Sequence, residues 1–215
     1  MERKDIIREF ISKPSVIFTY FGIAAVVFVT TSLITWLASY FIKTWNVAGD
    51  RAGTMSSLVM VLALVGAPVG GFLTDKWRKT QYNARLLFPA LSTFLSAVFL
   101  FAALYLFRGI LQYVMFLIMG VLIMCFISGA AAVTQDVIHP GLRATSYAIA
   151  VIVQNLLGAS TAPIIVGKLY DLTNIETALA VLPFVLILGA SLFYIGSRYY
   201  ADDMEKVAKI NLEVA

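Results

Sequence analysis

Residues 109 to 135 read GILQYVMFLIMGVLIMCFISGAAAVTQ and contain no Asp, Glu, Lys, Arg or His. Five other stretches share this property: 14 to 42, 52 to 74, 86 to 107, 144 to 167 and 177 to 197. The shortest of the six has 21 residues. As a helix it rises about 31 Å, close to the roughly 30 Å thickness of a hydrocarbon core. We therefore predict six transmembrane helices.

The composition of the whole chain agrees with a membrane protein. Hydrophobic residues make up 60% of the sequence and charged residues 13%, and the mean hydropathy is +0.89. A soluble domain of 215 residues has no room to bury six apolar helices of this length, whereas in lipid each helix satisfies its own backbone groups. The sequence predicts an all-α, polytopic membrane protein with one six-helix transmembrane domain, residues 14–200.

The positive charges predict the orientation. If the amino terminus is cytoplasmic, twelve Lys and Arg residues fall on the inside and four on the outside. The inside set is Arg3, Lys4, Arg8, Lys13, Lys76, Arg78, Lys79, Arg85, Arg143, Arg198, Lys206 and Lys209, and the outside set is Lys43, Arg51, Arg108 and Lys168. We therefore expect both termini in the cytoplasm and the protein in the cell (inner) membrane. Attraction to anionic lipids accounts for the net charge of +4, so no nucleic-acid partner is expected.

Two segments flank the transmembrane domain. Residues 1–13 mix Ile6, Ile7 and Phe10 with charged residues, which predicts an amphipathic segment on the cytoplasmic surface. Residues 201–215 are expected to form a cytoplasmic tail. At the outer interface, Tyr40 and Trp45 are interpreted as members of the aromatic belt.

The chain contains a weak internal repeat. Gly71 to Asp75 and Gly167 to Asp171 both read Gly-x-x-x-Asp, and each follows a proline, Pro68 or Pro163. Each copy ends the middle helix of a group of three. Because three is odd, the two middle helices run in opposite directions. This arrangement predicts a three-plus-three inverted repeat, the build of secondary transporters.

The loop from Gly71 to Lys79, GFLTDKWRK, resembles the cytoplasmic loop signature of the major facilitator superfamily, with Arg78 at the place of its second glycine. The stretches His139 to Ser146 and Gln154 to Gly158 are similar to the corresponding segments of spinster-like members. Members of the superfamily usually have twelve helices in two halves. The resemblance therefore implies the carboxy-terminal six-helix half of a transporter, whose partner is a second six-helix half: a missing amino-terminal half or another copy.

One glycine and six charged residues near the helix ends are candidates for gating. They are Gly71, Asp75, Lys76, Arg78, Lys79, Asp136 and Arg143. A carboxylate such as Asp75, aimed at the start of a neighbouring helix, gains about 0.3 to 1 kcal/mol, enough to bias one conformation. Arg143 is a candidate partner for Asp136. The alternative for the cations is that they only fix the topology.

Polar and aromatic residues in the middle of the membrane are candidates for substrate binding. They are Thr31, Thr35, Trp36, Ser128, Gln154 and Asn155. The two amides stand out, because lipid satisfies none of their donors or acceptors. The alternative is hydrogen bonding between helices. The six apolar stretches hold no ionisable Asp, Glu, Lys, Arg or His, which favours a small organic or amphipathic solute and places any proton-coupling group elsewhere.

Enzymatic activity is not expected. His139 is the single histidine, in a predicted loop, and Ser128 is followed by glycine as in a close helix contact. We expect neither a cofactor nor a metal, and the expected partners are the solute, membrane lipids and the second half. Two alternatives to a half-carrier remain: a membrane scaffold without transport activity, and a six-helix carrier that pairs with itself.

Overall fold

The computed structural model describes the backbone of residues 9–214 and the side chains of residues 9–207. Within that part, six helical spans are long and apolar enough to cross a membrane, which confirms the predicted number. The spans are Pro14–Trp45, Gly49–Arg78, Ala84–Leu106, Gly109–Asp136, Pro140–Leu172 and Ile175–Val207. Ile6 and Ile7 of the expected amphipathic segment lie outside the described residues.

Two spans are continuous helices and four are built of shorter pieces. The continuous helices are α2 (Pro14–Trp45) and α3 (Gly49–Arg78). The third span joins α4 (Ala84–Phe101) to a π-helical turn, η1 (Ala102–Leu106), and the fourth joins α5 (Gly109–Ile123) to α6 (Ile127–Asp136). The fifth span contains η2 (Pro140–Leu142), α7 (Arg143–Val153), the π-helical turn η3 (Gln154–Ala159) and α8 (Thr161–Leu172). The sixth contains α9 (Ile175–Ala180) and α10 (Leu182–Val214).

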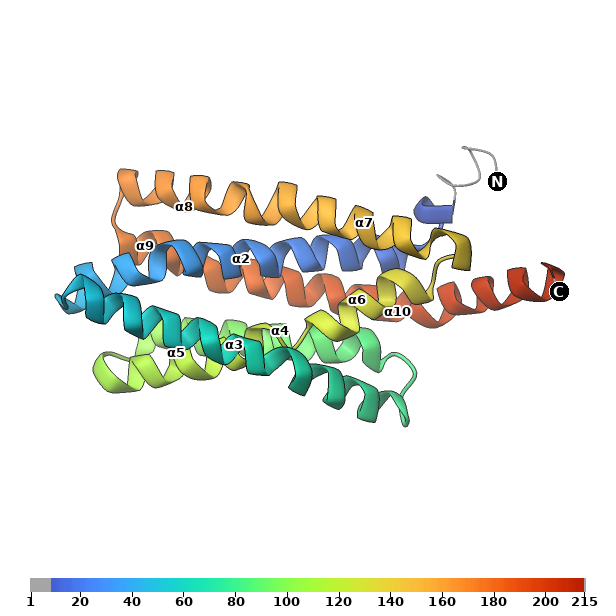
Figure 1. Ribbon diagram of the computed structural model, residues 1–215, viewed down its shortest axis with the longest axis horizontal. Helices are drawn as coiled ribbons and strands as arrows, with labels where there is room; N and C mark the ends of the chain where they lie inside the picture. Colours follow the sequence, from blue (N-terminus) through green and yellow to red (C-terminus); the bar gives the residue numbers. More distant parts are fainter. Residues whose placement is uncertain (1–8, 215) are drawn as a thin grey trace.

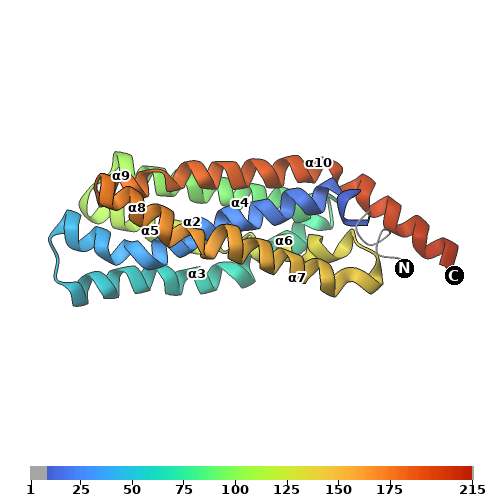
Figure 2. The same cartoon turned by 90° about the horizontal axis from the view of Figure 1, so that it is seen from above.

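The helices form one elongated bundle (Figures 1 and 2). The start of α2 and the end of α10 lie at the same end, which we name the terminal end, and α10 extends beyond the bundle there. In the view from above, α10 and α4 lie along one side and α3 and α7 along the other, with α2 between them (Figure 2). Residues 201–214, expected as a separate tail, continue α10.

Glycines bring the two middle spans into close contact with their neighbours. A Cβ atom on Gly70 of α3 would lie 2.1 Å from the backbone oxygen of Cys125, and a Cβ on Gly158 of η3 would lie 2.7 Å from that of Ala24. Span two thus packs on span four, and span five packs on span one. This exchange is what an inverted repeat of two three-helix units requires, so the predicted architecture is confirmed.

The second and fifth spans leave the largest share of their surface uncovered. They have the smallest buried fractions of the six spans in the described part. On α3, the exposed large apolar side chains are Leu58, Val61, Leu64, Val65, Val69, Phe72 and Leu73. By contrast, α10 packs tightly against both α2 and α4. The surfaces that α2, α4 and α10 turn toward one another are therefore buried, whereas large apolar faces of α3, α7 and α8 stay exposed.

Gln112 organises the end of the bundle opposite the terminal end. Its amide oxygen accepts from Trp45 Nε1 at 2.9 Å, and its amide nitrogen donates to the Tyr40 hydroxyl and to the Ala103 carbonyl, each at 2.6 Å. Tyr40 is fully buried, so its assignment to the aromatic belt is wrong. A buried amide and a buried phenol each need partners, and here they satisfy one another.

Asp203 holds the start of α2 from the far end of the chain. Its Oδ2 accepts from the Ser15 N–H at 3.0 Å and from the Ser15 hydroxyl at 2.6 Å, and its Oδ1 lies 2.9 Å from Lys206 Nζ. Lys13 donates to the Asp203 carbonyl at 3.1 Å. Burial lowers the pKa of Lys13, because desolvation outweighs the attraction of Glu9 and Asp203. Asp203 thus supplies the cap that Lys13, at the N-cap position, does not.

Candidate functional site

A hollow of about 530 Å³ lies between α2 and α3 and reaches the end of α5. Its lining combines aliphatic side chains, methionines and hydroxyls. The lining residues are Thr30, Ile34, Ser56, Ser57, Met60, Val61, Ala63, Leu64 and Met124. None of them is charged. A hollow of this size and chemistry falls within the range of small-molecule sites, which are mostly apolar with a few polar groups.

The hydroxyls in the hollow are held by their own helices. Thr30 donates to the Val26 carbonyl at 2.9 Å, and Ser56 donates to the Ala52 carbonyl at 2.9 Å. Each hydroxyl oxygen keeps lone pairs that can accept from a solute. The sequence did not single out Thr30 or Ser56, because a serine or threonine within a span is more often part of the packing surface.

The predicted substrate residues of α2 lie near α8. Thr35 is exposed and donates to the Thr31 carbonyl at 2.9 Å. The Trp36 ring packs edge-on against Tyr170, with centroids 5.6 Å apart, and lies over Gly167. The Trp36 indole N–H is buried and has no hydrogen-bond partner among the described side chains and backbone. An unpaired buried donor is uncommon and marks this position as one where a bound group can add a hydrogen bond.

The two amides lie at a different depth. Gln154 and Asn155 begin the π-helical turn η3, a distortion that is often found at functional sites. Gly158 contacts α2 at Ala24, whereas Gly167 contacts Trp36. Asn155 precedes Gly167 by twelve residues and is therefore separated from the level of Trp36 by roughly 18 Å along the bundle at a rise of 1.5 Å per residue. The structure divides the predicted substrate residues into two levels and does not bring them into one site.

Asn155 and Ser128 both bond to backbone carbonyls. Asn155 is exposed, and its amide nitrogen donates to the Val151 carbonyl at 2.7 Å. Ser128 donates across the helix interface to the Ala67 carbonyl of α3 at 3.2 Å. The hydroxyl of Ser128 therefore contributes to the contact between α6 and α3, which is the packing alternative considered from the sequence.

A charged cluster joins three helices at the terminal end. Arg85 of α4 forms an ion pair with Asp136 of α6, and the Tyr200 hydroxyl of α10 donates to Asp136 Oδ2 at 3.0 Å. The predicted pairing of Asp136 with Arg143 is therefore wrong. The physical reason is that Arg143 opens α7 as an exposed residue, whereas Arg85 enters the bundle beside Asp136.

The loop signature lies beside this cluster. Asp75 is exposed near the end of α3, and both Asp75 and Arg78 are within electrostatic reach of Arg85. Lys76 and Lys79 are exposed. Gly71 lies against Ser128, since an added Cβ would be 3.1 Å from its Oγ. Asp75 and Arg78 of the signature thus lie near Arg85, whose partner Asp136 is on α6.

Comparisons with known proteins agree with this architecture. The family model described as Major Facilitator Superfamily matches residues 2–163. Protein spinster homolog 1 of Xenopus laevis is 25% identical over 223 residues, which cover 91% of this chain and 42% of that protein. The sphingosine-1-phosphate transporter SPNS2 of Danio rerio is 23% identical over 222 residues, with 91% and 44% coverage. The chain spans less than half the length of these curated relatives.

Solved structures show the same fold. A bacterial homologue of the human lysosomal transporter spinster, in an inward-facing and unoccupied conformation, superposes with a TM-score of 0.77 at 17% identity. The match covers 94% of this chain and 51% of that one. The same homologue in an inward-facing and occupied conformation gives a TM-score of 0.73 at 18% identity.

Proposed function

Because the chain belongs to the Major Facilitator Superfamily, we propose that it moves a small solute across the membrane by alternating access, as the carboxy-terminal half of a twelve-helix carrier. The observation that carries the proposal is the uncharged hollow between α2 and α3, which opens on the side of the bundle where apolar helix faces are uncovered. A second six-helix half placed on that side would enclose the hollow and cover those faces.

We propose an amphipathic solute. Its apolar part would contact Met60, Leu64 and Met124, and its polar part would donate to the hydroxyls of Thr30 and Ser56. The absence of charged lining residues on this half disfavours a highly charged ligand, unless the other half supplies the opposite charge. One relative is named a sphingosine-1-phosphate transporter. The apolar chain of such a molecule fits the apolar lining, whereas its phosphate would need cations from the other half.

The terminal end is proposed to be cytoplasmic and to act in gating. The predicted topology assigns twelve of the sixteen Lys and Arg residues in the sequence to the cytoplasmic side. The exposed Asp75, beside the Arg85 and Asp136 pair, is placed to contact a moving partner half while the pair itself keeps α4 and α6 together. Such a contact would bias one conformation without fixing it, since exposed charge pairs contribute only about 0 to 1 kcal/mol.

Accessibility to water tests the proposed hollow. In a Cys125→Ala background, we expect a cysteine placed at Ser57 to react with a water-soluble maleimide in intact membranes and to be protected by a transported solute. A cysteine at Val98, which is exposed on α4 and does not line the hollow, is the matched control and should not react. Equal and slow labelling of both positions would contradict the transport site and favour a membrane scaffold.

The size of the natural product tests the half-carrier. A small tag after Ala215 in the unaltered locus allows the mass of the natural chain to be measured. A product of about twice the 23.6 kDa of this chain is expected for one half of a twelve-helix carrier. A product near 23.6 kDa would overturn the proposal that both six-helix halves belong to one polypeptide. Cross-linking would then distinguish a carrier assembled from two chains from a scaffold.

A further inference from the structure

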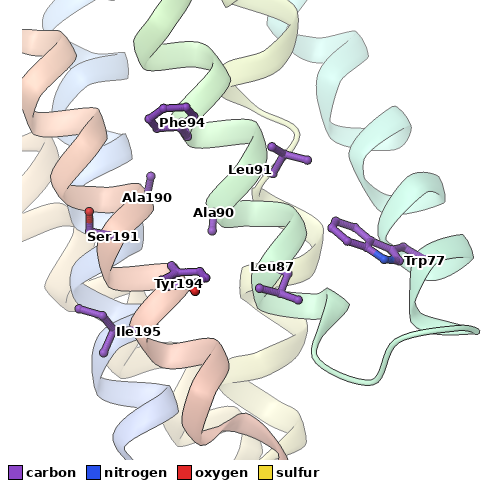
Figure 3. Close-up of a pocket in the computed structure, with 9 residues that line it drawn as sticks. All are labelled: Trp77, Leu87, Ala90, Leu91, Phe94, Ala190, Ser191, Tyr194 and Ile195. Atoms are coloured by element: carbon purple, nitrogen blue, oxygen red, sulfur yellow. The ribbon is translucent and has the colours of Figure 1, made fainter.

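A second apolar hollow lies on the opposite side of the bundle, along the outer faces of α4 and α10 (Figure 3). Its volume is about 610 Å³. The lining residues are Trp77, Leu87, Ala90, Leu91, Phe94, Ala190, Ser191, Tyr194 and Ile195. In Figure 3, Phe94, Ala90 and Leu87 follow one another along α4, with α10 on one side and Trp77 of α3 on the other. We name this hollow the α4–α10 groove.

Small residues create the groove between larger neighbours. Ala90 of α4 and Ala190 of α10 are almost fully buried where the two helices meet and form its floor. Phe94 and Tyr194 stand beside them and are about half exposed. An apolar channel that opens outward from a membrane-spanning bundle is the surface that a lipid acyl chain covers, because no water competes for it.

The end of the groove nearest the terminal end carries aromatic and cationic groups. Trp77 and Tyr194 line the groove there, and such residues sit where the apolar core of the membrane meets the headgroups. The Arg198 guanidinium lies 4.9 Å from the centre of the Tyr194 ring and donates to its hydroxyl. Arg198 is also the first charged residue after the apolar stretch 177–197, which places it at headgroup level.

Arg198 retains donors for another partner. Among the side chains of residues 9–207 it forms no salt bridge, although the exposed Asp202 lies one helical turn further along α10. Stacking on Tyr194 orients the guanidinium and leaves further N–H groups for an anion. Arginine is well suited to phosphate, because its planar fork donates two parallel hydrogen bonds.

We propose that the α4–α10 groove binds one anionic phospholipid, with an acyl chain along Ala90 and Ala190 and the phosphate on Arg198. The apolar lining of the groove favours an acyl chain, and Arg198 at its headgroup end favours a negatively charged phosphate. The site lies on the side of the bundle opposite α3 and α7, so a second half placed on the exposed faces of α3 and α7 would not cover it (Figure 2). The lipid site is therefore independent of the proposed transport activity.

Native mass spectrometry of the full-length protein in detergent tests the site, with phosphatidylglycerol and phosphatidylcholine of identical acyl chains as probes. We expect phosphatidylglycerol to be retained more tightly than phosphatidylcholine. Arg198→Gln should weaken its retention about five-fold, the effect of one cation at a membrane surface. Arg143→Gln, which removes another exposed cation from the same end of the bundle, is the matched control and should change retention little.

Filling the groove tests the position of the chain. Ala190→Leu should lower the retention of both lipids, because the added side chain occupies the floor. Ser191→Leu fills the same groove from an exposed position and serves if the first variant does not fold, as judged by its thermal unfolding. Equal losses in the two arginine variants would overturn specific binding in favour of diffuse attraction. Unchanged lipid retention in the filled variants would also overturn the proposal. The same holds if the wild-type protein shows a dimer mass that the filled variants lose, because the groove would then be occupied by a second copy of the chain.

Discussion

Replacing Asp203 should open the start of α2. In the Asp203→Ala variant, the Ser15 N–H and the Ser15 hydroxyl lose their acceptor in a site where Asp203 is 1% exposed. Loss of a helix cap costs about 1 kcal/mol, and a buried donor without a partner costs about 1 to 3 kcal/mol. The sum is about 2 to 4 kcal/mol of local stability.

Hydrogen exchange measures this loss directly. Protection of the amides in the first turns of α2 should fall by at least about 30-fold, the equivalent of 2 kcal/mol. Asp202→Ala is the matched control, because Asp202 is the neighbouring residue, carries the same charge and is exposed. Its effect should lie within about 0.5 kcal/mol. If the α2 amides exchange at the same rate in the two variants, the hydrogen bonds from Ser15 to Asp203 do not stabilise the start of α2, and the reasoning is refuted.

Two further changes test the packing inside the bundle by thermal unfolding in detergent. Gly158→Ala should destabilise the protein by about 1 to 3 kcal/mol, because its Cβ would overlap a backbone carbonyl of α2. Gly53→Ala is its control: Gly53 has open space around it, so this change should be neutral or stabilise by about 0.5 to 1 kcal/mol. Gln112→Leu should cost more than about 2 kcal/mol, since it leaves the buried Tyr40 hydroxyl and two other groups without their partner. The exposed Gln81 changed to Leu is its control, and equal melting of the two glutamine variants would contradict the proposed role of the buried amide.

The inverted repeat is a feature of the fold that could be predicted from the sequence. Two Gly-x-x-x-Asp segments predicted that spans two and five correspond, and the close contacts of Gly70 with span four and of Gly158 with span one agree with this correspondence. The sequence did not predict the depth at which the polar residues lie in the bundle. Asn155 and Trp36 both belong to apolar stretches, and only the register between α2 and the fifth span places them at different levels.

Charge partners were the least predictable feature. Arg143 follows Asp136 closely in sequence and was the natural candidate, yet Arg85 binds the carboxylate. A salt bridge depends on which side chains enter the same space. In a bundle, that is fixed by helix rotation and by contacts between spans distant in the chain. The same reasoning applies to Tyr40, whose place near a span end suggested the membrane interface while its rotation about α2 buries it against Gln112.

The sequence by itself determined the solvent, the number of spans and the family of folds. Lipid requires every span to satisfy its own backbone groups, so uninterrupted apolar stretches are sufficient to identify the helices. The tertiary structure alone decided which helix faces are buried, that Asp203 caps a helix beginning at Pro14, and that grooves open on two opposite sides of the bundle. These features depend on contacts between residues far apart in sequence, and hydropathy carries no information on such pairs.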